Sequence, residues 1–573
     1  MRKKVLISLA LSNVLSLNLL AIDIKTPDIS DAIKQAMPPK LDKEEEKKPP
    51  QLEIINNEKE PLVLKSGEKI YIKDFYLEDK EYIDFVALEE ILNLYKNKNL
   101  DMKDISELSS KISQLYKNKG YILARAYVPK QDVLKQNDVL VIKMVLGKYG
   151  KIDLKNNSYV NDLRLQKTIE TKLKKDSLVN KDGLEKTMLQ IGKMPGTSFP
   201  KVTIEPGSEF GQSDFLFDID KTKRLEGYLL GDNQGSIYTG EYRTMAGISI
   251  NSPLQIADKL SLNGMLSNGA GVKNIGISYS LPIFYSGLML DLSYNKTKTN
   301  TDIKEYSSDI QELMNSSIGD SDIYGVKLSY PLILSQLESL DLYLNLQKIE
   351  KNNVTEYFSY DKEEIPKDLN VARLGTNYEK FSSLFDLNLY SNLNSELSFG
   401  EVKRDDDIKK DGDDTVGNFS KLYLEYSANL ALNDKSSLIA NVKLQKALAN
   451  KSLDNFEQLT LSGTSGVKVY PDSEYSADSG YFLGLEYKYK LPEIQSFKHN
   501  VGFFVETARG FFENKEFIIY RELRTLNDIG VSYFVNKDKF FLDMKLAQIM
   551  GNEDVQSEDN YDRRFLISAG MIF

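Results

Sequence analysis

The chain contains a long succession of segments in which apolar and polar residues alternate, and this pattern constrains the fold more than any other feature. From about residue 224 to the end, sixteen such segments lie between turn-rich stretches. Side chains of a β-strand point to opposite faces with a period of two, and roughly ten residues are enough for a tilted strand to cross a bilayer. The sequence therefore predicts a mainly β protein with a 16-stranded transmembrane β-barrel.

The expected strands carry apolar residues on one face and polar or charged residues on the other. In the seventh, Leu342 and Leu344 alternate with Tyr343 and Asn345, and the last strand ends on an aromatic residue, Phe573. One face can thus meet lipid while the other lines a hydrophilic lumen. The strands are expected near 225–232, 243–252, 258–267, 274–283, 286–297, 321–333, 338–350, 369–380, 382–393, 419–432, 435–447, 479–491, 498–509, 523–535, 538–549 and 563–573.

The connections between these strands alternate in length. Those after even-numbered strands are short, whereas most of those after odd-numbered strands are long. Outer-membrane barrels combine tight periplasmic turns with longer external loops, and a soluble propeller or sandwich would not be expected to show this parity. Long external loops are expected at 298–320, 351–368, 394–418 and 448–478.

The composition of the chain argues against several kinds of site. The 573 residues carry a formal net charge of −10, which argues against a nucleic-acid partner. The chain has no cysteine and one histidine, His499, so disulfides and thiolate chemistry are excluded and most catalytic triads, zinc sites and haem sites lack their ligands. We therefore expect no enzyme activity, no metal and no cofactor.

The first 65 residues divide into three segments. Residues 1–21 combine a basic start, an apolar stretch and Ala21 at a plausible cleavage point, which resembles a secretory signal peptide. Residues 22–40 hold one short helix candidate that stops at Pro38-Pro39, either a docked plug or a disordered leader. The charged, proline-rich stretch that follows predicts a flexible linker over 41–65. The chain is thus expected to be exported and to cross a membrane with strands.

Two tandem α+β modules are expected before the barrel, over 66–148 and 149–222. The first reads strand, helix, helix, strand, strand; its second helix is capped by Asp101 and ends at Gly120, and its last strands lie over 122–128 and 139–145. The second module repeats this order. Each small sheet has an edge strand, and an open edge can accept an extended peptide by β-augmentation.

This layout resembles that of the two-partner secretion (type Vb) outer-membrane transporters, the family of haemolysin activation/secretion proteins and filamentous haemagglutinin transporters. Local motifs agree at 116–129, 147–150, 232–243, 251–258 and 279–282. The resemblance implies two periplasmic POTRA (polypeptide-transport-associated) domains, an N-terminal plug helix at 22–40 and an outer-membrane barrel over 223–573. It also implies a motif in the first POTRA domain, formed by Gly120, Tyr121, Arg125, Tyr127 and Pro129. Phe573 is the implied C-terminal assembly signal.

The sixth external loop carries the most informative motif. The family has Val-Arg-Gly/Ala-Tyr there, and its arginine pairs with the aspartate of a Phe-x-Asp-x-Gly motif on the inner wall of strand thirteen. Lys468 and Glu506 stand at those two positions and keep both charges, but a lysine lacks the planar fork of arginine. We hypothesise that they pair and hold the loop in the lumen; the alternative is two unrelated solvated charges. The two motifs comprise Val467, Lys468, Val469 and Tyr470, and Phe504, Glu506 and Ala508.

The resemblance implies an outer-membrane translocase. The POTRA domains would recognise the secretion domain of an unfolded partner exoprotein, and the barrel would export it without nucleotide hydrolysis. The implied partners are a large exoprotein, usually an adhesin or a haemolysin, outer-membrane lipid, and the barrel-assembly machinery during biogenesis, with no nucleic acid. Two other interpretations stay open: an insertase of the same superfamily, which usually carries more POTRA domains, and a passive porin or surface adhesin, for which the modules would be superfluous.

Overall fold

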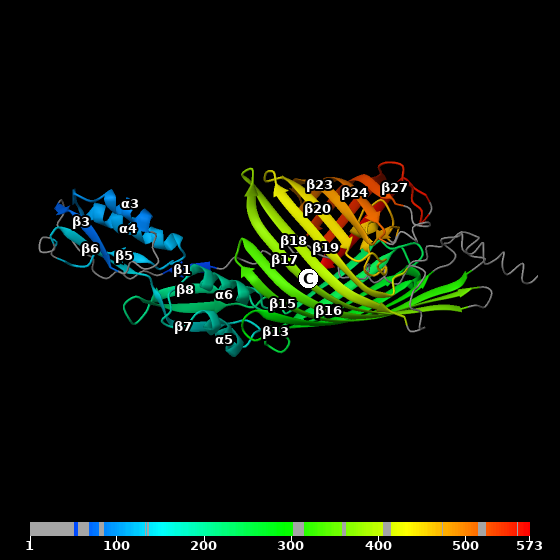
Figure 1. The fold of residues 1–573 in the computed structure, drawn as a ribbon, viewed down its shortest axis with the longest axis horizontal. Helices are drawn as coiled ribbons and strands as arrows, with labels where there is room; N and C mark the ends of the chain where they lie inside the picture. The colour runs from blue at the N-terminus through cyan, green and yellow to red at the C-terminus, as the bar shows by residue number, and fades with distance from the viewer. Residues whose placement is uncertain are drawn as a thin grey trace, which may run out of the picture.

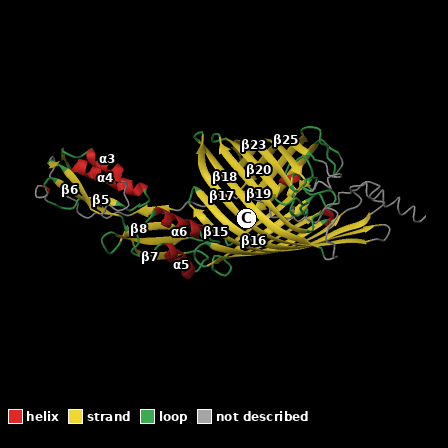
Figure 2. Cartoon of the chain, viewed as in Figure 1, coloured by secondary structure: helices red, strands yellow, loops and turns green. Residues whose placement is uncertain are grey.

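Two small modules precede a large β-barrel along the molecule (Figure 1). The computed structural model describes residues 51–54, 68–78, 85–131, 133, 137–301, 314–357, 362–404, 414–472, 474–513, 523–558 and 560–573. The predicted signal peptide (1–21), the plug helix (22–40) and most of the linker (41–65) lie outside the described residues. The α-helices that the structure describes lie in the two modules (Figure 2), and none of them is long and apolar enough to cross a membrane.

The barrel is closed and has sixteen strands, as the alternation predicts. Each strand pairs antiparallel with the next, and the last closes the barrel on the first, with Tyr228 opposite Ile572. The strands are β10 (Leu225–Asp232), β11 (Arg243–Asn251), β12 (Lys259–Ser267), β13 (Val272–Ile283), β14 (Leu288–Thr301), β15 (Met314–Leu334), β16 (Glu338–Tyr357), β17 (Lys362–Leu384), β18 (Leu387–Lys403), β19 (Gly417–Ala431), β20 (Ser436–Ala447), β23 (Ser479–Ile494), β24 (Phe497–Phe511), β25 (Thr525–Lys537), β26 (Phe540–Ile549) and β27 (Arg563–Ile572).

The two faces of the wall separate apolar from polar side chains as expected. On β16, Leu342, Leu344 and Leu346 are exposed on the outside, while Asn345 and Gln347 line the lumen. Such an outer apolar face suits lipid, and the polar inner face suits a hydrated lumen.

Strands β15 to β18 are much longer than the alternation predicts. The prediction of a long external loop at 351–368 is wrong for most of its length, because the ladder continues there: Lys351 pairs with Lys367 and Thr355 with Glu363. In the loop predicted at 394–418, residues 394–403 belong to β18 and 405–413 lie outside the described residues. Both faces of a strand can be polar once it has left the membrane, so the apolar alternation fades while the backbone hydrogen bonds persist. These strands project far beyond the rest of the rim (Figure 1).

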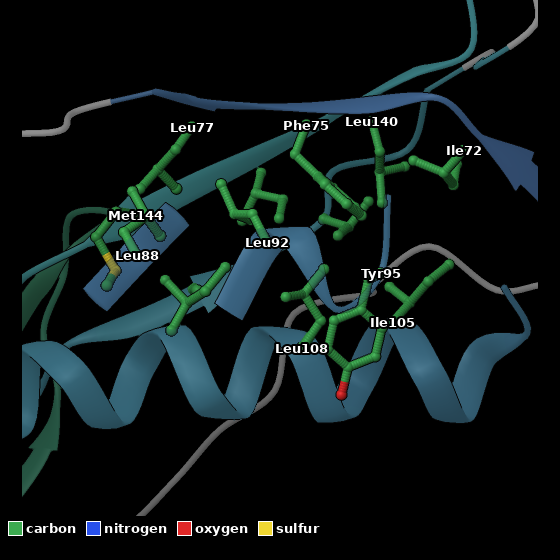
Figure 3. Packing of buried hydrophobic residues seen from close by; sticks show 14 of the residues in the cluster. Ile72, Phe75, Leu77, Leu88, Leu92, Tyr95, Ile105, Leu108, Leu140 and Met144 are labelled. Carbon is green, nitrogen blue, oxygen red and sulfur yellow. The ribbon is translucent and has the colours of Figure 1, made fainter. Parts of the chain in front are cut away.

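The first module packs two helices on a small sheet of order β3-β6-β5. Its elements are β2 (Ile70–Ile72), β3 (Asp74–Glu78), α3 (Phe85–Asn93), β4 (Lys98–Leu100), α4 (Met102–Asn118), β5 (Arg125–Tyr127) and β6 (Val139–Val145). Asp101 caps α4 by accepting hydrogen bonds from the backbone N–H groups of Lys103 and Asp104, at 2.9 and 3.0 Å. Figure 3 shows Leu92, Ile105 and Leu108 in the core between helices and sheet.

The strand predicted over 122–128 is reduced to β5. Ile122 and Leu123 leave the sheet because they pack against the core of the second module. The backbone turns before β5, where the N–H of Ala124 donates to the carbonyl of Tyr121 at 2.9 Å.

The second module repeats the fold with β7 (Lys148–Asn156), α5 (Asp162–Lys172), α6 (Lys181–Lys193), β8 (Lys201–Pro206) and β9 (Gln212–Ile219). Its sheet gains a fourth strand from the predicted linker, because β1 (Gln51–Ile54) runs parallel to β8 and gives the order β1-β8-β9-β7. A flexible linker is therefore the wrong description of residues 51–54. They pair because the edge of β8 offers unsatisfied backbone groups.

The second module is attached on one side to the short turns of the barrel. The Gln190 side-chain amide donates to the carbonyl of Tyr285 at 3.0 Å, and the N–H of Gln336 donates to the Glu185 carboxylate at 2.8 Å. Asn161 contacts the carbonyl of Gln255 through its backbone N–H, at 2.8 Å. These contacts involve turns of the β11 to β16 half of the barrel, next to which the module lies in Figure 1.

Candidate functional site

The connection between β20 and β23, residues 448–478 and called loop 6 below, folds back into the barrel. A two-stranded hairpin, β21 (Leu459–Thr460) with β22 (Ser476–Ala477), forms its stem. Its apolar side chains form a buried cluster with residues of the wall, and Val467, Val469 and Tyr470 are fully buried there. Burying these side chains holds the loop inside.

The tip of loop 6 is tied to the wall by Lys468 and Glu506. The Lys468 ammonium forms an ion pair with Oε1 of Glu506, and the Lys468 backbone N–H donates to Oε2 of the same carboxylate at 3.1 Å. The Phe504 ring centre lies 5.1 Å from the ammonium. Lys468 thus contacts both oxygens of the Glu506 carboxylate. An arginine would do so with two guanidinium nitrogens, whereas here the backbone N–H supplies the second donor.

A second buried carboxylate, Asp528 on β25, also holds the tip. Its Oδ2 accepts a hydrogen bond from the N–H of Val469 at 2.9 Å, and it is fully buried. Asp528 is the cross-strand neighbour of Glu506. The alternation on β25 indicates that Asp528 faces inward, but nothing in the sequence pairs it with loop 6.

The outgoing arm of loop 6 is held by Arg524, at the start of β25. Arg524 forms an ion pair with Glu474 of the loop, and its Nε donates to Glu553 at 3.1 Å. Glu474 also accepts from the N–H groups of Gln556 and Ser557, at 3.0 and 2.8 Å. Burial opposes ionisation of Glu474, but the hydrogen bonds from Ser557 and Arg524 outweigh it and lower its pKa.

A fourth contact joins loop 6 to the first hairpin of the barrel. Arg243 donates two hydrogen bonds to the Asp232 carboxylate, from Nε to Oδ1 at 2.8 Å and from Nη2 to Oδ2 at 3.0 Å. Its remaining nitrogen lies 3.5 Å from Asp472 of loop 6. The sequence places Asp232 and Arg243 in one motif, and the structure pairs them directly across β10 and β11.

Below loop 6 the lumen opens into a cavity of about 1880 Å³. Its lining runs from loop 6, at Glu457 and Lys468, down to the turns that face the periplasmic modules, at Lys435 and Lys539. Most of the residues that line it carry polar or charged side chains. Loop 6 therefore lies inside the lumen at the outer end of this cavity.

The other predicted site residues lie far from loop 6. Gly120 has φ +97° after α4, and its carbonyl accepts from the Lys181 N–H at 2.8 Å, which joins the two modules. Arg125 and Tyr127 lie on β5, an edge strand; Tyr121 packs on the module core and Pro129 follows the strand. Phe573 ends the barrel seam, where its backbone exchanges two hydrogen bonds of 2.9 Å with Gly227.

Comparison with known families gives two matches. Residues 211–548 match the family described as haemolysin secretion/activation protein ShlB/FhaC/HecB, and residues 70–147 match the ShlB-type POTRA domain. Curated relatives include the heme/hemopexin transporter protein HuxB of Haemophilus influenzae, 26% identical over 79% of this chain and 78% of the relative. The hemolysin transporter protein ShlB of Serratia marcescens is 24% identical over 74% of this chain and 72% of its own length.

Solved structures share the fold. CdiB from Escherichia coli aligns over 95% of both chains with a TM-score of 0.70 and 18% identity. BamA from Haemophilus ducreyi lacking POTRA domains 1–3 aligns over 88% of this chain and all of its own, with a TM-score of 0.51 and 14% identity. The likeness to CdiB includes the modules as well as the barrel.

Proposed function

The chain belongs to the haemolysin secretion/activation family ShlB/FhaC/HecB, whose members are transporters, and we propose that it exports one unfolded partner exoprotein through its barrel. It is an outer-membrane protein with its POTRA domains in the periplasm. By analogy with relatives named for heme/hemopexin and hemolysin transport, the partner would be a large secreted protein, an adhesin or a haemolysin.

The proposed route begins at the POTRA sheets. An extended segment of the partner would add to an open strand edge, where backbone hydrogen bonds give affinity with little demand on sequence. In the first module, β5 with Arg125 and Tyr127 is such an edge. In the second, β1 already occupies the edge of β8, so a partner can pair there only after β1 has left.

The observation that best supports transport is loop 6, folded into the lumen above a cavity open toward the modules. Loop 6 is held by the Lys468 to Glu506 contact, by Asp528 and by Arg524, and a polypeptide could pass only when these contacts break. No nucleotide would be needed, since folding of the partner outside the cell would prevent its return. The role of Lys468 and Glu506 in secretion stays a prediction.

The test is genetic and uses Lys468→Ala. Deleting the gene should remove one large protein from the culture medium, and the wild-type gene should restore it. Lys468→Ala should leave the barrel in the membrane and abolish secretion, because we expect loop 6 to need this docked position before each partner enters. Lys348→Ala, which breaks an ion pair with Glu350 outside the cavity, should secrete normally. Normal secretion by Lys468→Ala would remove the gating role, and general loss of outer-membrane proteins on deletion would support an insertase instead.

A further inference from the structure

Loop 6 presents carboxylates to cations of the barrel wall. The described part of the loop has five acidic residues, and four of them form ion pairs with lysine or arginine outside the loop. Asp454 lies 2.6 Å from the Lys351 ammonium on β16 and 3.5 Å from that of Lys367 on β17. Lys351 and Asp454 are almost completely buried.

Glu457 repeats the arrangement one turn further along the loop. It forms an ion pair with Arg373 on β17 and another with Lys421 on β19, at 2.8 Å. Asp472 meets Arg243, and Glu474 meets Arg524. A buried cation without a partner is costly, so the wall cations need carboxylates in place whenever water is excluded.

The cavity below loop 6 is also lined by more cations than acids. Of its lining residues outside loop 6, twelve are lysine or arginine and eight are aspartate or glutamate, although the whole chain has a net charge of −10. At the periplasmic end, Lys435, Lys490, Lys498 and Lys539 are exposed in or beside the turns that join β19 to β26. These four are called the rim lysines below.

The rim lysines lie on the half of the mouth opposite the attached module. The contacts of the second module fall on the turns at Gln255, Tyr285 and Gln336, which belong to β11 to β16. The rim lysines belong to β19 to β26. A chain entering from the periplasm would therefore meet them first. Asp434 and Asp538 stand beside Lys435 and Lys539 in the same turns, but cations outnumber acids over the whole lining, and such an excess raises the local concentration of negatively charged segments.

We propose that these wall cations form a binding track for carboxylates of the unfolded partner, and that the acids of loop 6 occupy its outer end at rest. The inference rests on the proposed export function and adds the chemistry of the segment that enters: an extended polypeptide rich in Asp and Glu. The partner's carboxylates would first bind the rim lysines. They would then replace Glu457 and Asp454 on Arg373, Lys421 and Lys351 as loop 6 withdraws.

Binding of labelled peptides to the purified full-length protein in nonionic detergent tests this proposal. Two fluorescent 20-residue peptides are compared by anisotropy, one alternating Glu and Ser and the other alternating Lys and Ser. At low salt the Glu peptide should bind at least ten times more tightly. The difference should shrink in about 1 M salt, where screening limits charge–charge interactions to about 3 Å. Equal binding, or tighter binding of the Lys peptide, would overturn the proposal.

Two variants assign the binding to the track. Changing the four rim lysines to Gln should weaken Glu-peptide binding at least tenfold. The matched control changes four exposed lysines of β14, β16, β17 and β18 to Gln, at 298, 348, 362 and 403, and should have less than a twofold effect. An equal loss of Glu-peptide affinity in the rim-lysine variant and in the control would mean that only the net charge of the protein matters, which would contradict a binding track.

The second variant does not depend on four simultaneous changes. Glu457→Gln removes the loop carboxylate from Arg373 and Lys421, so the Glu peptide should bind several-fold more tightly. Unchanged or weaker binding would contradict the idea that loop 6 acids occupy the track. Failure of the wild-type gene to secrete any protein would instead refute export itself, so the two failures are distinguishable.

Discussion

Replacing Arg524 with alanine should release loop 6 more than any change at its tip. Arg524 is 2% exposed and joins Glu474 of the loop to Glu553 of the last external connection. Its guanidinium also lies 5.8 Å from the Tyr470 ring centre and 5.9 Å from that of Tyr475. The alanine variant therefore leaves a buried carboxylate, Glu474, without its cation.

The size of the effect follows from what remains around Glu474. Removing one partner of a buried ion pair costs about 3–5 kcal/mol. The N–H groups of Gln556 and Ser557 still donate to Glu474, so we expect the lower end of this range. A cost of about 3 kcal/mol raises the ratio of released to docked loop by about 10², at about 1.4 kcal/mol per factor of ten.

The chain has no cysteine, so one introduced thiol reports on the loop. Val467 is fully buried, and Val467→Cys should react with a maleimide only when the loop leaves the wall. The labelling rate should rise about 10²-fold in Arg524→Ala and much less in Arg524→Lys, which keeps the charge. Adding Glu474→Ala to Arg524→Ala should recover part of the loss, because the buried carboxylate is then gone and Glu553, which also loses Arg524, is partly exposed.

Two results would refute this reasoning. A labelling rate within threefold of the parent in Arg524→Ala would show that the buried pair does not hold the loop. A larger rate in Lys468→Ala than in Arg524→Ala would show that the tip contact dominates, even though the Lys468 side chain is 22% exposed.

Three further predictions concern the barrel wall, the first module and an outer loop. Leu344→Arg places a charge on the lipid face and should lower barrel stability by about 2–4 kcal/mol in urea unfolding from lipid vesicles, while Asn345→Arg on the lumen face should cost little. Leu108→Ala empties part of the first module's core and should cost about 2–5 kcal/mol, measured as earlier proteolysis of that module in urea. Burial raises the pKa of Glu558 to about 6 from 4.5. The folded state then holds its proton more tightly than the unfolded state, so stability is full below about pH 4.5 and falls as pH rises through 6; the loss of urea midpoint between pH 5 and 7 should be smaller in Glu558→Gln.

The sequence predicts the barrel because its signal is periodic and local. Alternation on a strand such as β16 follows from lipid on one face and water on the other, and it ends where that asymmetry ends. This is why β15 to β18 extend well past their predicted ends. The strand at 51–54 was missed for a related reason, since four residues pairing with β8, about 150 residues away, leave no periodic signal of their own.

Some residues of the candidate site could be predicted from the sequence, and others could not. Lys468 and Glu506 could be identified together because a motif links them, and the structure brings them into contact. Arg524 and Glu474 are fifty residues apart in chain order, in different connections, and each resembles an ordinary surface charge in sequence. Asp528 gains its role only through a backbone N–H of loop 6, which has no side-chain signature.

The tall side of the barrel, formed by β15 to β18, has a consequence for the proposed export of a partner. The 20 residues of β16 span about 66 Å along the strand, or about 50 Å in height at a tilt of about 40°, against an apolar band of about 25 Å. About half of this wall thus stands in the medium, on one side of the exit only. On the proposed export function, the first segment of the partner to leave the barrel would fold beside this wall, which shields it on one flank, while the opposite flank is open to the medium.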